Sequence, residues 1–143
     1  MDRKKVFLDT NVYIDYLERR EGFRAALALF KLSAIGEIKL AISDLSIANS
    51  KYITRKTIPL ETFYSVTARL QKYFSIVSVG SDAVECALAL KAKDFEDALQ
   101  YYSALQAEAD YIVTNNTSDF YFATSIEIIE PDSFIEKFFP EEY

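Results

Sequence analysis

The feature that most constrains this chain is the alternation of short apolar runs with longer stretches of helical periodicity. Five runs fit β-strands, at residues 5–8, 39–43, 76–79, 111–114 and, more briefly, 127–129. Strands that alternate with helices are joined by right-handed crossovers, so they form a parallel sheet with helices on both faces. The sequence therefore predicts a three-layer α/β/α fold with a central parallel sheet of four to five strands.

Helical stretches fill the spaces between these strands. Six are expected at residues 11–19, 23–35, 44–55, 81–91, 96–109 and 131–138, and a further one opens at Thr57. The helix that opens at Thr57 should place five residues on one face: Leu60, Phe63, Thr67, Leu70 and Phe74. No linker, internal repeat or low-complexity segment interrupts the pattern, so residues 1–143 are expected to form a single domain.

Composition excludes several kinds of catalysis. The chain has no histidine, which excludes Ser-His-Asp and Cys-His nucleophiles, histidine general bases and zinc sites that need histidine. Its three glycines lie far apart, so no glycine-rich phosphate loop exists. The one cysteine, Cys86, is expected to be a small core residue of a helix. Any catalysis must therefore depend on carboxylates.

Charge is unevenly distributed along the chain. Residues 1–60 hold 11 Lys/Arg and 7 Asp/Glu, whereas residues 61–143 hold 5 and 15. This asymmetry allows a basic rim beside an acidic centre, although the net charge of −6 argues against a strong general nucleic-acid binder. Neither a membrane-spanning apolar run nor a signal-peptide core is found, so we expect a cytoplasmic location and no membrane partner.

Polar residues follow two of the predicted strands. Asp9-Thr10-Asn11 follows the first strand, Thr114-Asn115-Asn116 follows the fourth, and Asp119 comes a turn later. Ligands of open parallel sheets bind beyond the carboxyl ends of the strands, so these residues can converge there. The helix that leads into the fourth strand adds three carboxylates near its start: Asp94, Glu96 and Asp97.

Each of the three main carboxylates has a simpler structural interpretation. Asp9 could be only a helix N-cap, Asp97 could only complement a helix dipole, and Asp119 could be a turn residue. Their joint placement at one edge of the sheet favours a site. Carboxylates without histidine or thiolate suit Mg²⁺ or Mn²⁺, and such a cation can promote hydrolysis of a phosphodiester.

Three segments in order resemble the PIN-domain family over essentially the whole chain. They are VFLDTNVYIDYL, AISDLSIANSKYITRK and DFEDALQYYSALQAEADYIVTNNTSDF. The likeness is greatest to toxin-type members, the VapC-like ribonucleases. This resemblance implies a PIN-like fold, cleavage of RNA with Mg²⁺ or Mn²⁺, an antitoxin protein as partner and, as is often seen in these toxins, a homodimer.

The resemblance also implies roles for individual residues. Asp9 matches the first metal-binding carboxylate of the family, Asp97 the third and Asp119 the fourth. Asn11 and Thr114 match polar residues that surround the site. We count Asn116 and Asp94 with these supporting residues because they fall at the same predicted edge of the sheet.

The sequence departs from the family at two positions. The second acidic position, usually a glutamate, is Asn49, and the arginine of the usual Thr-Arg-Asn is Asn115. An amide keeps an oxygen ligand but lacks the negative charge, so the affinity for metal should fall. Asp44 and Glu96 are candidates to replace the missing carboxylate, although Asp44 better suits helix capping.

Basic residues could line a path for the RNA backbone. The candidates are Arg19, Arg20, Lys51 and Arg55, which could equally form solvated helix faces. The leading hypothesis is a toxin-type endoribonuclease. The alternative is a weak or inactive PIN-like module that binds a protein or RNA partner. A phosphatase of the haloacid dehalogenase type is disfavoured, because its second aspartate would be at Asn11.

Overall fold

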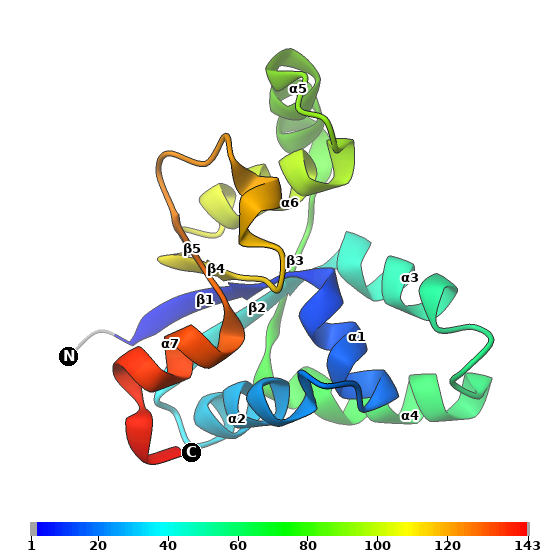
Figure 1. Ribbon diagram of the computed structural model, residues 1–143. Coiled ribbons are helices and arrows are strands. Elements are labelled where there is room, and N and C mark those ends of the chain that lie inside the picture. The colour runs from blue at the N-terminus through cyan, green and yellow to red at the C-terminus, as the bar shows by residue number, and fades with distance from the viewer. Residues whose placement is uncertain (1–2, 143) are drawn as a thin grey trace.

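The computed structural model describes residues 3–142 and contains one five-stranded sheet (Figure 1). Every pair of neighbouring strands is parallel, and the order is β3-β2-β1-β4-β5. The strands are β1 (Lys4–Leu8), β2 (Ile38–Ser43), β3 (Ser75–Val77), β4 (Tyr111–Val113) and β5 (Glu127–Ile129). The predicted three-layer α/β/α fold with a parallel central sheet is confirmed.

Helices cover both faces of the sheet. In residues 3–142 they are α1 (Thr10–Glu18), α2 (Phe23–Ala34), α3 (Asp44–Ile53), α4 (Leu60–Leu70), α5 (Gly80–Leu90), α6 (Phe95–Gln106) and α7 (Pro131–Phe138). Short 3₁₀ turns lie at Gln71–Tyr73, Thr117–Phe120 (η2) and Pro140–Glu142. Helices α1, α2, α4 and α7 lie on one side of the sheet in Figure 1, and α5 and α6 lie on the other.

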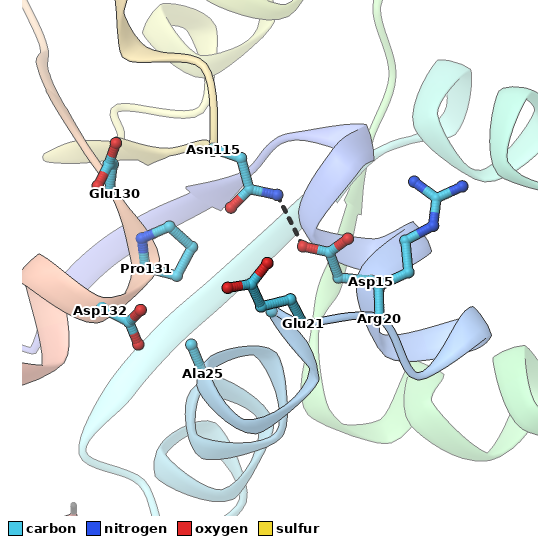
Figure 2. A pocket seen from close by; sticks show the side chains of 9 residues that line it. Asp15, Arg20, Glu21, Ala25, Asn115, Glu130, Pro131 and Asp132 are labelled. Carbon is cyan, nitrogen blue, oxygen red and sulfur yellow. Dashed lines mark hydrogen bonds between the residues drawn. The ribbon is translucent and has the colours of Figure 1, made fainter.

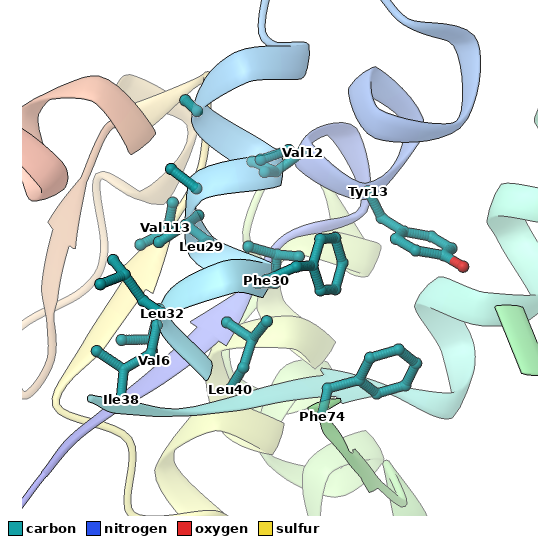
Figure 3. Close-up of a cluster of buried hydrophobic side chains, with 14 of the residues drawn as sticks. Val6, Val12, Tyr13, Leu29, Phe30, Leu32, Ile38, Leu40, Phe74 and Val113 are labelled. Carbon is teal, nitrogen blue, oxygen red and sulfur yellow. The ribbon is translucent and has the colours of Figure 1, made fainter. Parts of the chain in front are cut away.

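The central strand β1 shows why both faces need cover. Val6 and Leu8 pack into the larger core beneath α1 and α2, whereas Phe7 points to the opposite face, against Tyr101 of α6. Successive side chains of a strand point to opposite faces, so an unbroken apolar strand must be buried on both. Figure 3 shows the larger core, in which Leu29 and Leu32 of α2 pack near Val6.

One sequence expectation about a buried residue is wrong. Cys86 is exposed, because α5 packs on α6 through a narrow seam around Ala83 and Ala87, and Cys86 lies outside that seam. On α4 the core contact begins at Phe63, so Leu60, in the first turn, is 57% exposed. No helix in the described part of the chain is both long and apolar enough to span a membrane.

Candidate functional site

The candidate site begins where β1 and β4 end side by side. Leu8 pairs with Val113 in the parallel register, so Asp9 and Thr114 follow at the same edge of the sheet. Thr114 Oγ1 donates a hydrogen bond of 2.8 Å to Asp9 Oδ2. Asp9 Oδ1 accepts from the backbone N–H of Thr10, so Asp9 is the N-cap of α1 and also lines the site. The two roles considered for Asp9 are therefore compatible.

Two further donors hold the Asp9 carboxylate. Asn11 Nδ2 donates to Oδ2 and Gln100 Nε2 donates to Oδ1, both at 3.2 Å. Asn11 Oδ1 in turn accepts from the backbone N–H of Asn115. A carboxylate has about four acceptor positions, so a cation that reaches Asp9 must replace one of these bonds. The two longer bonds are the ones that a cation would replace most readily.

Helix α6 brings the next group of carboxylates to the same place. Asp94 is its N-cap and accepts from the backbone N–H of Asp97 at 3.0 Å. Together with Asp9 these side chains line an open hollow of about 220 Å³. Its lining has five carboxylates, from Asp9, Asp94, Glu96, Asp97 and Asp119, and four amides, from Asn11, Asn49, Gln100 and Asn116. The hollow thus contains all the predicted acidic and supporting residues except Thr114, which lies behind Asp9.

The carboxylates of the hollow repel one another. Burial, followed by the charges of Asp94, Asp9, Asp119 and Glu96, raises the pKa of Asp97 to about 7. Burial also raises the pKa of Asp9, against the lowering effect of its hydrogen bonds. The ion pairs seen within residues 3–142, Arg20–Glu18 and Lys137–Glu127, involve none of these carboxylates. Such a group of like charges favours the binding of a cation.

The donor set fits a hydrated hard cation. Carboxylate and amide oxygens line the hollow, without a thiolate or imidazole, which favours Mg²⁺ or Mn²⁺ over zinc. Across residues 3–142, no three acidic side chains stand close enough together to ligate one ion as they are placed. Mg²⁺ commonly keeps several waters and uses one or two carboxylates. The arrangement therefore suits a partly hydrated ion better than an ion enclosed by protein ligands.

Asn49 has a carboxylate beside it. Its Nδ2 donates to Glu96 Oε1 at 2.5 Å, and both residues line the hollow. Asp44, the other candidate to replace the missing glutamate, instead accepts from the backbone N–H groups of Leu45 and Val79. The structure thus brings Glu96, but not Asp44, to the position where Asn49 lacks a charge.

The predicted basic residues lie in two places. Arg19 is the C-cap of α1, which has nine residues, so it lies at the end of the helix away from Asp9. At 1.5 Å per residue this separation is roughly 14 Å. Lys51 is on α3 and Arg55 lies in the turn after it; they contact the rings of Tyr64 and Tyr52, at 6.0 and 3.9 Å from the ring centroids. Between them in sequence, Ile53 lines the hollow.

A second hollow lies on the other side of Asn115 (Figure 2). It measures about 770 Å³, and its lining includes Asp15, Arg20, Glu21 and Glu130. Asn115 Nδ2 donates to Asp15 Oδ2 at 2.7 Å, as Figure 2 shows. None of Asp9, Asp97 and Asp119 lines this hollow, so its greater size does not make it the better catalytic candidate.

One residue of the site was not predicted from the sequence. Gln100 of α6 is 2% exposed, lines the carboxylate hollow and contacts Asp9. It lies one helical turn after Asp97, on the same face of the helix. That spacing is the only signal in the sequence that could have identified it.

The chain is similar to known proteins over most of its length. A family model described as PIN domain matches residues 5–118. The chain is similar to Ribonuclease VapC1 of Aquifex aeolicus (strain VF5), with 27% identity over 143 residues that cover 96% of this chain and 97% of the relative.

Solved structures share the fold. VapBC2 from Rickettsia felis, bound to a DNA fragment from its promoter, contains a chain with a TM-score of 0.66 and 19% identity, over 87% of this chain and 96% of that one. A toxin-antitoxin complex from Klebsiella pneumoniae contains another, with a TM-score of 0.64 and 22% identity, over 88% and 97%.

Proposed function

Because this chain belongs to the PIN-domain family, we propose that it is a toxin-type endoribonuclease, VapC-like, that uses Mg²⁺ or Mn²⁺ to hydrolyse RNA phosphodiester bonds. One observation carries the proposal: carboxylates from β1, α6 and η2 gather in one hollow at the carboxyl edge of the sheet. The similarity to Ribonuclease VapC1 supports the same activity.

In this proposal the residues of the hollow have distinct tasks. Asp9, Asp97 and Asp119 hold one or two cations, and Glu96 supplies the charge that Asn49 lacks. Thr114 and Asn11 hold the Asp9 carboxylate in one orientation. A bound Mg²⁺ or Mn²⁺ supplies Lewis-acid chemistry, which lowers the pKa of a water and offsets charge at the phosphate.

Two basic side chains for the RNA backbone lie at the C-terminal end of helix α3. Lys51 and Arg55 lie on either side of Ile53 in sequence, and Ile53 lines the hollow. Arg19 and Arg20 are less suited to this task, because they lie at the far end of α1 and Arg20 pairs with Glu18. We therefore assign phosphate contacts to Lys51 and Arg55.

An antitoxin protein is the proposed partner. The similar chains from Rickettsia felis and Klebsiella pneumoniae come from toxin-antitoxin complexes. On this chain, α3 and α4 expose large apolar side chains that a partner could cover: Tyr52, Ile53, Leu60 and Tyr64. A protein bound there would also cover Lys51 and Arg55 and so block RNA. We also propose that the chain forms a homodimer, as such toxins often do.

The direct test is an RNA cleavage assay with Mg²⁺ or Mn²⁺. Wild type should cleave, and Asp9→Asn should lose at least about a hundredfold in rate, because a carboxylate ligand is removed. Asp82→Asn is the matched control, since Asp82 is an exposed acid of α5 outside the hollow. Equal cleavage by wild type and Asp9→Asn would sink the proposal, as would no cleavage of varied RNAs by the wild type.

Asn49 favours a second candidate, a PIN-like module that binds a partner with little or no cleavage. The amide removes one charge from the hollow, although Glu96 lies beside it. Calorimetry with Mn²⁺ separates the two candidates. Micromolar binding by wild type that is lost in Asp9→Asn counts against the binding module, and absent Mn²⁺ binding counts for it.

A further inference from the structure

Gln100 is a buried polar residue with contacts to several parts of the site. It lies on α6, one turn after Asp97, and only 2% of it is exposed. Desolvating an amide is costly unless its donors and acceptor are all bonded. The hydrogen-bond partners of Gln100 therefore indicate the role of this side chain.

Its strongest bonds go to the start of α3. Gln100 Oε1 accepts from Ser43 Oγ at 2.7 Å, and Nε2 is 2.6 Å from Ser46 Oγ. Ser43 caps α3 by accepting from the backbone N–H of Ser46. The amide is thus anchored at both of its ends to the N-terminus of the helix that carries Asn49.

The same amide nitrogen faces the end of β1. Gln100 Nε2 lies 3.2 Å from Asp9 Oδ1 and 3.3 Å from Thr10 Oγ1. The Thr10 and Ser46 hydroxyls are themselves 2.7 Å apart, which closes the network. Two N–H groups here serve three acceptors, so the bonds to Asp9 and Thr10 are the weaker ones.

These contacts join three of the segments that supply acidic and amide side chains to the hollow. Asp9 follows β1, Asn49 lies on α3, and Asp97 and Glu96 lie on α6. The side chain of Gln100 bridges all three. Because Gln100 and Asp97 share one face of α6, fixing Gln100 also fixes the distance from Asp97 to Asp9.

We propose that Gln100 is a positioning residue, which holds α6 against β1 and α3 so that Asp9 and Asp97 can share a cation. This inference rests on the proposed function. Residues that orient metal ligands typically change metal affinity or activity by about 10–100-fold when they are replaced. We assign Gln100 an effect of about tenfold, because its bond to Asp9 is one of four.

The test compares Gln100→Met with Gln106→Met. Methionine keeps the length of the side chain and removes the amide, and Gln106 is an exposed glutamine on the same helix. Mn²⁺ affinity is measured by calorimetry, kcat and KM by RNA cleavage, and folding by the midpoint of thermal unfolding. Gln100→Met should bind Mn²⁺ about tenfold more weakly and show a lower kcat with an unchanged KM. Excess Mn²⁺ should restore the kcat, and Gln106→Met should match wild type.

A purely structural role would give a different result. In that case Gln100→Met lowers the unfolding midpoint, while the folded variant binds Mn²⁺ with the affinity of wild type, and the inference is overturned. If Gln100→Met does not fold, Gln100→Asn replaces it, because the shorter side chain cannot reach Ser43, Ser46 and Asp9 together. Wild-type affinity for Mn²⁺ in that variant also overturns the inference.

Failure of the proposed function is recognised separately. Wild type that neither binds Mn²⁺ nor cleaves RNA overturns both the function and the role of Gln100. If wild type binds Mn²⁺ and cleaves RNA, and Gln100→Met does so equally well, only the proposed role of Gln100 is overturned.

Discussion

At the scale of single residues, Asp97 shows most clearly the effect of crowding acids in the hollow. Its carboxylate is partly withdrawn from water, and four other carboxylates act on it, so its pKa rises to about 7. A carboxyl whose pKa is higher in the folded than in the unfolded state binds its proton more tightly when folded. Folding stability is therefore lost as the pH rises from about 4 to 7 and levels off above that range.

The change Asp97→Asn should abolish this pH dependence. Without Mn²⁺, the variant should unfold at a higher temperature than wild type at pH 8, because it lacks the repelled charge. The difference should shrink toward pH 4, near the ordinary pKa of 3.8, because there Asp97 is protonated in the folded state and about half protonated in the unfolded state of the wild type. Thermal unfolding from pH 4 to pH 8 in EDTA measures it. An equal difference at both ends of this range would contradict the prediction.

A second prediction concerns Glu96. Glu96→Gln should weaken Mn²⁺ binding about tenfold or more, because it removes the carboxylate beside Asn49. Asp44→Asn is the matched control and should leave the affinity unchanged, since Asp44 bonds to backbone N–H groups outside the hollow. Calorimetry measures both. Equal affinities of Glu96→Gln and wild type would show that Glu96 does not replace the missing acid.

The sequence identified most of the residues that meet in the hollow, for a physical reason. Asp9 and Asn116 follow strands, and parallel strands end at the same edge of a sheet. Gln100 was missed because its role depends on Ser43 and Ser46, which lie more than fifty residues away in sequence. Long-range hydrogen bonds of this kind leave no periodic signal in a sequence.

At the scale of elements, Gly22 and Asp15 lie very close together at the junction of α1 and α2. A Cβ atom added at Gly22 would lie 2.2 Å from Asp15 Oδ2. Asp15 is buried and accepts from Asn115 Nδ2, so its carboxylate has little freedom to move. Glycine is therefore required where α2 begins, for reasons of space and not of backbone angle.

Gly22→Ala should therefore destabilise the fold, by about 1–3 kcal/mol as for other overpacked sites. Denaturant unfolding measures the loss. The matched comparison repeats the change in an Asp15→Ala background, where the clashing carboxylate is absent and the cost should largely disappear. The same cost in both backgrounds would show that the close approach is not its cause.

The sequence predicted the elements well but their exposure less well. Strands and helices follow from the period of the apolar residues, and each predicted element is present. Whether one side of a helix is buried depends on which other elements pack against it. The period of the apolar residues does not encode that packing. Cys86 was expected in the core for this reason, and it is exposed.

At the scale of the whole molecule, the hollow joins segments from across the chain. Asp9 and Asp119 are 110 residues apart in sequence, yet both line it. Alternating strands and helices predicted the parallel sheet, whereas the order β3-β2-β1-β4-β5 depends on pairings that the pattern does not specify. A cation bound in the hollow would link the two halves of the sheet.

Metal should therefore stabilise the entire fold. At a free Mn²⁺ concentration of a hundred times Kd, binding to the folded state alone adds about 2.7 kcal/mol. The unfolding midpoint of wild type should rise with Mn²⁺ and return to its starting value with EDTA, and that of Asp9→Asn should stay constant. An equal rise in both proteins would place the bound metal outside the hollow.

The central position of β1 has a consequence for synthesis. The ribosome makes the strand that precedes Asp9 first, yet its neighbour β4 begins only at Tyr111. The pocket that collects Asp9, Asp97 and Asp119 cannot assemble until the chain has been translated beyond residue 119. Until then a nascent chain, still close to the messenger, tRNAs and ribosomal RNA around it, carries no complete carboxylate site.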